Sequence, residues 1–268
     1  MRITDLFQRT PSRVIRCGRS GVLTAIDALV FLSQMREDVA DIVFIDPPFN
    51  LDKDYGFARS LENRSASAYG EYMERLFKES VRVLKPGGAL FLYHLPVWAS
   101  RFSAQLNEAL VFRHWIAVTM KNGFVRGRHL YPAHYALLYY TKGRPAVFCR
   151  PRLRPQRCRH CDELVKDYGG YTPIIMRKGI NLSDVWDDLS PVRHKGNKYR
   201  KANELPVVLT DRVVKMAGRR RRLLVDPFVG TGTTLVSATN AGLVFAGNDM
   251  SRKSINVARR RLAEEAGV

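Results

Sequence analysis

Apolar residues along this chain of 268 residues fall into short runs, separated by longer segments in which they recur every three or four positions. The run at 40–46 stops at Pro47 and Pro48, which cannot donate to a β-ladder, so it predicts a buried strand. Between 68 and 84 the apolar side chains fall near one helical face, and Lys-Pro-Gly-Gly at 85–88 predicts the end of that helix. By the same criteria we expect a strand at 89–93, a helix at 102–110, and strands at 115–120 and 134–140.

The last third of the chain shows a similar alternation. Its pattern predicts, in order, a helix at 204–217, a strand at 222–226, a helix at 233–241, a strand at 244–249 and a helix at 252–264. Strands that alternate with helices are typical of a sheet whose two faces are covered by helices. We therefore predict an α/β fold with a doubly wound, mostly parallel sheet.

A different composition separates these two parts of the chain. From about 143 to 201 the sequence is rich in Arg, Pro, Gly and Cys and has no clear periodicity. We interpret 143–201 as an insert rather than more of the sheet. The segments 1–142 and 202–268 then form the two parts of one α/β domain.

The charge of the chain indicates what it binds. There are 44 Lys and Arg residues against 25 Asp and Glu, which gives a formal net charge of +19. Self-repulsion of this size favours a polyanionic partner, and nucleic acid is the leading one. The basic residues are spread over several clusters rather than one tail, so we expect a folded face that lies along a phosphate backbone. These clusters lie at 144–159, 193–201, 219–222 and 252–261.

Membrane and metal sites are not expected. The chain has no stretch of roughly 20 apolar residues and no apolar signal-peptide core, so we predict a soluble, cytoplasmic protein. In a reducing compartment its four cysteines are thiols or metal ligands rather than disulfides. Cys158 and Cys161 have the spacing of a zinc knuckle, but structural zinc needs four ligands and no second pair is evident. We therefore predict no metal site. The zinc candidates weighed for this prediction are Cys158 and Cys161.

A glycine-rich turn, from Asp226 to Thr234, follows the strand predicted at 222–226. Its glycines let the backbone approach a ligand closely, and the next helix offers unpaired N–H groups to an anion. The following strand ends at Asp249, whose carboxylate could accept hydrogen bonds from ribose hydroxyls. This pattern favours a nucleoside cofactor over an ordinary tight turn. Because Leu235 replaces the third glycine of the dinucleotide motif, a dinucleotide and S-adenosylmethionine both remain open at this point.

A second motif, Asp46-Pro47-Pro48-Phe49, stands at the carboxyl end of a predicted strand, where open α/β sheets bind ligands. The amino group of a nucleic-acid base is a poor nucleophile, because its lone pair is delocalised into the ring. A carboxylate and a main-chain carbonyl that accept its two N–H bonds would localise that lone pair. Asp46 supplies the carboxylate, the stiff Pro-Pro turn aims the carbonyl, and Phe49 offers a face for a flipped base. This chemistry favours S-adenosylmethionine as the cofactor.

The two motifs, in this order, resemble the β class of amino-group DNA methyltransferases, in which the Asp-Pro-Pro-aromatic motif precedes the cofactor motif. The resemblance implies that the insert at 143–201 recognises the target in double-stranded DNA. It also assigns two sets of residues. The catalytic set is Asp46, Pro47, Pro48 and Phe49, and the S-adenosylmethionine set is Asp226, Phe228, Gly230, Gly232, Thr233 and Asp249, with Asn203 and Glu204 as further neighbours.

The chain departs from the family pattern at two places. The family often carries His-Pro-Thr-Gln-Lys-Pro where this chain has Lys201-Ala-Asn-Glu-Leu-Pro206. It also usually carries Gly-Asp upstream of the catalytic strand, and here the corresponding pair is interpreted as Gly18-Arg19. The second departure leaves the acidic cofactor contact expected there without a residue.

The same resemblance implies an activity and a set of partners. An Asp at the head of the Pro-Pro motif favours methylation of adenine N6, with cytosine N4 as the alternative and an RNA amino group as a further one. The other partners considered are a second copy of the chain and a cognate restriction enzyme.

Several aromatic residues and histidines stay outside this scheme. The aromatics among the basic residues either stack on bases or pack the insert. The histidines are expected to be structural, because the chemistry outlined above needs no imidazole. The aromatics are Tyr168, Tyr171, Trp186 and Tyr199, and the histidines are His94, His129 and His134.

Overall fold

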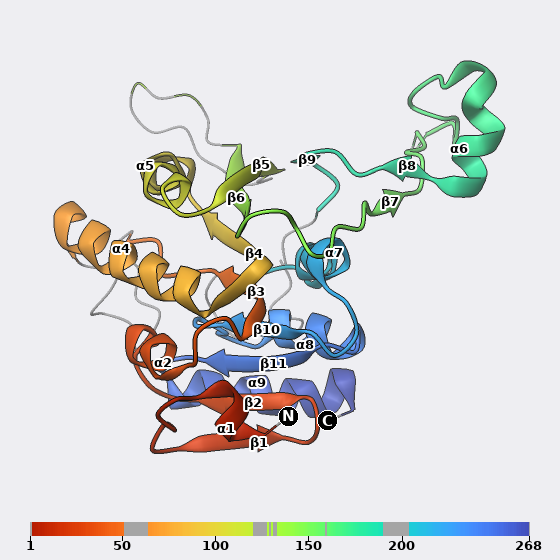
Figure 1. The fold of residues 1–268 in the computed structure, drawn as a ribbon. Coiled ribbons are helices and arrows are strands. Elements are labelled where there is room, and N and C mark those ends of the chain that lie inside the picture. The colour runs from red at the N-terminus through yellow and green to blue at the C-terminus, as the bar shows by residue number, and fades with distance from the viewer. Residues whose placement is uncertain are drawn as a thin grey trace.

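One mixed sheet of nine strands organises the computed structural model, which describes residues 2–50, 64–119, 128, 130, 133–158, 160–189 and 204–267. The strands stand in the order β1-β2-β11-β10-β3-β4-β6-β5-β9 (Figure 1). Their bounds are β1 Val14–Cys17, β2 Gly21–Thr24, β3 Ala40–Ile45, β4 Leu84–His94, β5 Val111–Thr119, β6 His134–Thr141, β9 Val185–Trp186, β10 Leu223–Asp226 and β11 Val244–Asn248.

The centre of the sheet is parallel. Strands β2, β11, β10, β3 and β4 are neighbours that all run in one direction. Strand β1 is antiparallel to β2 at one side, and β6 is antiparallel to both β4 and β5 at the other. The prediction of a mostly parallel α/β sheet is confirmed.

Helices cover both faces of the sheet, because successive side chains of the central strands point to opposite faces and are buried on both. One face packs against α2 (Ala28–Gln34), α4 (Ala66–Val83) and α5 (Pro96–Asn107). The opposite face packs against α7 (Val207–Ala217), α8 (Thr233–Asn240) and α9 (Arg252–Ala266). A short helix, α1 (Ile3–Leu6), precedes β1. Across the described ranges, no helix combines the length and apolar character needed to cross a bilayer.

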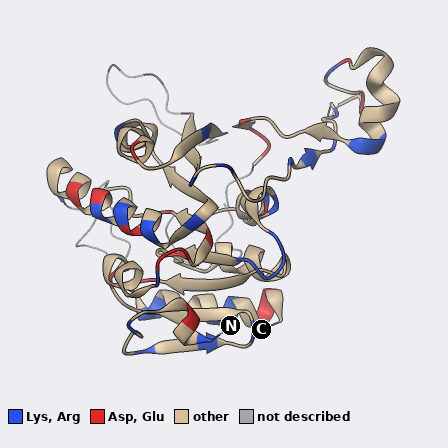
Figure 2. Ribbon diagram, in the orientation of Figure 1, with Lys and Arg blue, Asp and Glu red and all other residues tan. Residues whose placement is uncertain are grey.

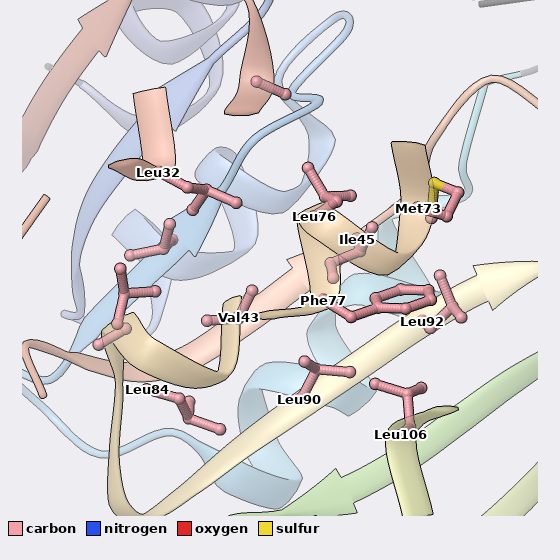
Figure 3. Packing of buried hydrophobic residues seen from close by; sticks show 14 of the residues in the cluster. Leu32, Val43, Ile45, Met73, Leu76, Phe77, Leu84, Leu90, Leu92 and Leu106 are labelled. Atoms are coloured by element: carbon pink, nitrogen blue, oxygen red, sulfur yellow. The ribbon is translucent and has the colours of Figure 1, made fainter. Parts of the chain in front are cut away.

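Helix α4 illustrates how sequence and packing agree. Its buried side chains recur at helical spacing and lie on the sheet, as Figure 3 shows for Leu76 near Ile45 and Phe77 beside Leu92. The hydroxyl of Ser65 caps the helix by accepting a hydrogen bond from the N–H of Ala68 at 3.2 Å. The predicted helix at 68–84 is therefore confirmed, with its start two residues earlier.

The Lys-Pro-Gly-Gly segment at 85–88 lies inside a strand rather than before one. Ala40 of β3 pairs with Leu84 and Ile42 pairs with Ala89, so the intervening residues of β4 form an irregularity in the pairing. Gly87 has a φ of 77°, which glycine adopts without the strain that a side chain would bring. The helix ends before this segment as predicted, and the strand predicted at 89–93 lies within β4, but β4 starts earlier than predicted, at Leu84.

The segment after β6 builds an arm, which we define as residues 150–182. Two short strands, β7 (Arg152–Leu153) and β8 (Ile180–Asn181), pair as its stalk. The 3-10 helix η1 (Gly169–Tyr171) and helix α6 (Thr172–Lys178) form its end, away from the sheet (Figure 1).

Beyond the arm, the chain returns to the sheet. Strand β9 pairs in parallel with β5, and Trp186 of β9 is 1% exposed within the main core. The interpretation of 143–201 as containing no part of the sheet is therefore wrong at β9. A strand of two residues produces no readable periodicity, so the sequence pattern could not indicate it. Trp186 therefore packs in the core of the sheet, and neither of the two roles expected for it, stacking on bases or packing the insert, is seen.

Candidate functional site

The carboxyl ends of the parallel strands meet at one edge of the sheet. From β3 the chain crosses to β4 in one direction, and from β10 it crosses to β11 in the other, so β3 and β10 flank a topological switch point. Ligands bind in open α/β sheets beyond the carboxyl ends of the strands at such a point. Three acids from the sequence predictions come together here: Asp46 after β3, Asp226 at the end of β10 and Asp249 after β11.

The turn from β10 into α8 is held by its own first residue. One carboxylate oxygen of Asp226 accepts a hydrogen bond from the N–H of Phe228 at 2.8 Å, and the hydroxyl of Thr234 donates to the other. Gly232 caps α8 with a φ of 86°, and a Cβ there would lie 2.9 Å from the Cβ of Ala258 in α9. The glycine therefore permits both the turn and the close approach of α9.

Burial changes the acidity of this carboxyl group. The pKa of Asp226 is raised to about 7, mainly by burial; the hydrogen bonds from Thr234 and Phe228 oppose the rise, and the carboxylates of Asp46 and Asp249 add to it. The buried side chain of Asp226 thus holds the turn in place, because both of its oxygens accept hydrogen bonds from residues of the turn or from the first residues of α8.

Asp249 and Asn248 tie three strand ends together. The carboxylate of Asp249 accepts hydrogen bonds from the N–H of Gly230 at 3.0 Å and of Ser251 at 2.8 Å. The buried amide of Asn248 accepts from the hydroxyl of Thr24 at 2.7 Å and donates to the carbonyl of Pro227 at 3.3 Å. Asn248 was not among the predicted residues. Its signal in the sequence was a polar residue inside an otherwise apolar strand.

The pair Gly18-Arg19 lies at the wrong edge of the sheet for a cofactor contact. It is exposed in the turn that enters the amino end of β2. The acid that follows the carboxyl end of β2 is Asp27, which caps α2 by accepting hydrogen bonds from the N–H of Leu29 at 2.8 Å and of Val30 at 3.2 Å. The matching of Gly18-Arg19 to the Gly-Asp pair of the family is therefore wrong, because this pair lies at the amino end of β2 and not at the carboxyl end. An Asp before an apolar helical run was the available signal.

The Asp-Pro-Pro-Phe motif borders a cluster of aromatic rings. Phe49 is 6% exposed, and its ring centroid lies 6.1 Å from that of Tyr93 and 5.7 Å from that of Tyr135. Burial raises the pKa of both tyrosines, and the carboxylate of Asp46 raises it further. Asp46 therefore faces two neutral phenol groups beside the Phe49 ring, and sequence reasoning had not singled out either tyrosine.

A buried histidine stands behind this motif. The Nε2 atom of His94 lies 2.8 Å from the hydroxyl of Tyr69, and that hydroxyl donates to the carbonyl of Pro48 at 2.6 Å. Burial lowers the pKa of His94 to about 3, so its ring is neutral. His134 starts β6 and is half-buried, whereas His129 and Tyr199 lie outside the described residues.

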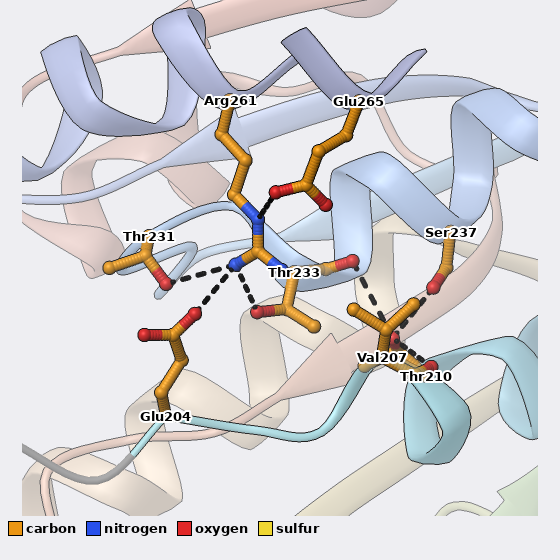
Figure 4. Close-up of polar contacts among 8 residues, drawn as sticks. All are labelled: Glu204, Val207, Thr210, Thr231, Thr233, Ser237, Arg261 and Glu265. Atoms are coloured by element: carbon orange, nitrogen blue, oxygen red, sulfur yellow. Dashed lines mark hydrogen bonds and ion pairs between the residues drawn. The ribbon is translucent and has the colours of Figure 1, made fainter. Parts of the chain in front are cut away.

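Glu204 is linked to the turn from β10 into α8 through Arg261 (Figure 4). Its carboxylate pairs at 2.9 Å with the guanidinium of Arg261, and the two side chains are 2% and 4% exposed. The same Arg261 nitrogen donates to the hydroxyl of Thr233 at 2.9 Å and lies 3.4 Å from that of Thr231. Arg261 was missed because nothing in the local pattern of α9 marks it. Asn203 lies outside the described residues.

The cysteine pair sits in the arm. Cys161 is exposed and Cys158 is half-buried, with the sulfur of Cys161 4.0 Å from a carboxylate oxygen of Glu163. Backbone N–H groups of Cys161 and His160 lower the pKa of Cys158. Within the described part of the chain, no three His, Cys, Asp or Glu side chains are grouped so that they could hold a metal ion.

Comparison with known proteins gives a consistent result. A family model described as DNA methylase matches residues 40–260. The Type II methyltransferase M.BamHI of Bacillus amyloliquefaciens is 44% identical over 85% of this chain, which spans 54% of the length of that protein. The Type II methyltransferase M.HpaI of Haemophilus parainfluenzae is 29% identical over 91% of this chain and 74% of its own.

Solved structures share the fold. TTHA0409 of Thermus thermophilus, a putative DNA modification methylase complexed with S-adenosyl-L-methionine, has a TM-score of 0.61 and 21% identity, covering 91% of this chain and 95% of its own. The cytosine-N4-specific PvuII DNA methyltransferase also has a TM-score of 0.61, with 15% identity over 97% of this chain and 95% of its own.

Proposed function

The chain belongs to the DNA methylase family, and from this premise we propose that it transfers a methyl group from S-adenosylmethionine to the exocyclic amino group of a base in double-stranded DNA. One observation supports the proposal most directly. The Asp-Pro-Pro-Phe motif after β3 and the glycine turn after β10 leave adjacent parallel strands at the switch point of the sheet. A methyl acceptor held at Asp46 would therefore be next to a donor held by the turn.

The turn has the properties that a nucleoside donor requires. Gly232 begins α8 without a side-chain cap, so the helix N-terminus keeps backbone N–H groups for a carboxylate. Asp249 is half-buried beside Gly230 and can accept from hydroxyl groups of a ribose. When bound, S-adenosylmethionine supplies a methyl group already activated by its sulfonium. Gly230, Gly232, Thr233 and Asp249 would hold it, with Asp226 and Phe228 shaping the turn.

On the acceptor side, the chain itself does the work of positioning. Asp46 would accept one N–H bond of the amino group, and a carbonyl of the Pro47–Pro48 turn would accept the other, which localises the nitrogen lone pair. The rings of Phe49, Tyr93 and Tyr135 would form the wall against which the flipped base rests. Catalysis is then mainly orientation and electrostatic stabilisation.

The arm is suited to bind DNA as the target-recognition part of 143–201. Figure 2 shows Lys and Arg along the stalk and at the end of α6. Exposed Tyr171 and Ile174 stand beside these charges and are candidates for base contacts. A restriction enzyme that recognises the same site is the partner this role implies. Among the described residues of the arm, the exposed charged side chains are Arg150, Arg152, Arg154, Arg157, Lys166, Arg177 and Lys178, against Asp162, Glu163 and Asp167.

Adenine N6 is the first candidate for the amino group and cytosine N4 the second. The motif begins with Asp46, which favours adenine by resemblance. Both bases present an amino group next to a ring nitrogen, and one carboxylate can accept a hydrogen bond from either. The relative YhdJ of Escherichia coli K12, 22% identical, is a DNA adenine methyltransferase, whereas the PvuII enzyme acts on cytosine N4.

Product analysis tests the proposal. Purified protein is incubated with methyl-labelled S-adenosylmethionine and double-stranded DNA, and the nucleosides are separated after digestion. Label in N6-methyladenine or N4-methylcytosine supports the proposal and identifies the base. Parallel incubations with single-stranded DNA and structured RNA address the alternative substrates: label confined to RNA, or label in no nucleoside, contradicts it.

A further inference from the structure

Three polar groups from different elements meet behind the Pro47–Pro48 turn. The carbonyl of Pro48, after β3, lies 2.6 Å from the hydroxyl of Tyr69 on α4. That hydroxyl lies 2.8 Å from Nε2 of His94, at the end of β4. The other ring nitrogen of His94, Nδ1, lies 2.8 Å from the backbone nitrogen of Leu95. The whole chain of contacts is buried or half-buried.

Hydrogen-bonding rules fix the direction of each bond. The N–H of Leu95 can only donate, so Nδ1 of His94 is the acceptor, and the proton of the neutral ring is on Nε2. Nε2 then donates to the hydroxyl of Tyr69, whose own proton is left to donate to the carbonyl of Pro48, which can only accept. A protonated imidazole would place an N–H against the N–H of Leu95, so this arrangement requires the neutral ring.

The turn depends on such an external contact because of its composition. Pro47 and Pro48 have no N–H group, so the backbone of the turn can be held only through its carbonyl oxygens. The ring of His94 also lies 4.9 Å from the ring of Phe49. One histidine therefore contacts the motif at two places, by packing on Phe49 and through Tyr69 at Pro48.

We propose that Tyr69 and His94 are positioning residues for methyl transfer, which hold the Pro48 carbonyl and thereby orient Asp46 and Phe49 toward the base. This inference rests on the proposed function. His94 is not the base that removes a proton from the amino group, because its acceptor nitrogen is already occupied by the N–H of Leu95. The pair acts through the backbone of the motif, so it should affect the transfer rate and leave cofactor binding unchanged.

Tyr69→Phe tests the hydroxyl alone, because the ring keeps its contacts with Trp98 and Phe102. Tyr140→Phe is the matched control: its hydroxyl also donates to an internal acceptor, Asn107, at 3.0 Å, away from the motif. We expect Tyr69→Phe to lower the single-turnover methylation rate by about 10- to 100-fold, with the cofactor Kd within about two-fold of wild type. The melting temperatures of the two variants should be similar.

His94 variants separate positioning from packing. His94→Gln can keep a donor near Nε2 and should retain part of the rate, whereas His94→Leu should lose at least as much as Tyr69→Phe, because it also removes the ring that packs on Phe49. Combining Tyr69→Phe with His94→Leu should add little, because both changes break the same connection. Additive losses, or a Tyr69→Phe rate no lower than that of Tyr140→Phe while the wild type is active, would overturn the inference.

A spectroscopic measurement is independent of activity. In 15N-histidine NMR spectra, His94 should carry its proton on Nε2 and should not titrate between about pH 5 and pH 9. Its Nε2 resonance should shift in Tyr69→Phe and stay unchanged in Tyr140→Phe. A proton on Nδ1 would contradict the positioning role. Failure of the wild-type protein to methylate DNA would instead contradict the proposed function, and the two failures are therefore distinguishable.

Discussion

Asp46 and Asp226 lie at the carboxyl ends of the neighbouring parallel strands β3 and β10, and the charge of Asp46 contributes to the raised pKa of Asp226. Burial is the larger cause, and the pKa of Asp226 reaches about 7. In an unfolded chain an Asp has a pKa of about 3.9. Between these two values the folded protein therefore holds a proton that the unfolded chain has released.

The stabilisation from this proton should be complete below about pH 4 and should be lost as the pH rises through about 7. Asp226→Asn removes the titration. The difference in unfolding free energy between wild type and Asp226→Asn should therefore change by a few kcal/mol across this window, since the other carboxylates cancel. Urea unfolding at a series of pH values measures it. Parallel pH profiles for the two proteins would show that Asp226 is ionised in the folded state.

Asp46→Asn should remove activity without removing the cofactor. Replacing the carboxylate weakens the acceptor that localises the amino lone pair, and we expect a loss of about 10²- to 10³-fold in the rate of transfer. Asp38→Asn is the control, at the amino edge of the sheet, where Asn tolerates the φ of 51°. Single-turnover assays measure the rate and calorimetry measures S-adenosylmethionine binding. An equal loss of cofactor binding in Asp46→Asn would place Asp46 in the donor site.

Arg261→Met should destabilise the fold and loosen the cofactor turn. It breaks the buried ion pair with Glu204, which costs about 3–5 kcal/mol, and it removes the donor to Thr233. Adding Glu204→Gln should restore part of the loss. The adjacent Arg260 is 63% exposed, and its pair with Glu264 is worth about 0–1 kcal/mol, so Arg260→Met is the matched control. Denaturant unfolding measures the loss of stability in each variant. Equal losses for the two Arg variants would show that the buried pair does not contribute more than the exposed one.

Charge removal from the arm should reduce the salt dependence of DNA binding. Each lost phosphate contact lowers the log–log slope of affinity against salt by about 0.9, so Arg150→Ala with Arg154→Ala should lower it by about 2. The same charge is removed by Arg13→Ala with Arg16→Ala, beside and within β1 at the far end of the sheet. Fluorescence anisotropy over a salt series compares the pairs. An equal change in slope for both pairs would indicate bulk charge rather than an arm contact.

Features encoded in neighbouring residues could be predicted from the sequence. The apolar run before Pro47, the glycine turn after Asp226 and the helical periodicity at 68–84 each depend on local chemistry, and each appears in the structure. The meeting of Asp46, Asp226 and Asp249 at one edge of the sheet could also be predicted, because parallel strands place their carboxyl ends together.

Features that depend on distant partners could not be predicted. The pair of Glu204 with Arg261 joins residues 57 positions apart, and the contact of Tyr69 with His94 joins a helix to a strand. Neither produces a periodic signal. The same holds for β9, whose pairing with β5 is determined by where the arm returns to the sheet.

The way the arm is attached has an evolutionary consequence. It leaves and re-enters the domain through the β7–β8 stalk, which pairs only two residues from each side, while β9 anchors the returning chain to the edge of the sheet. Substitutions, insertions or a complete exchange of residues 154–179 would leave the stalk, β9 and the edge that carries Asp46 and Asp226 untouched. With the arm in the proposed role of target recognition, a lineage could acquire new DNA sites by replacing this module while it inherits the chemistry unchanged, and chimaeras joined at the stalk would reproduce that process in the laboratory.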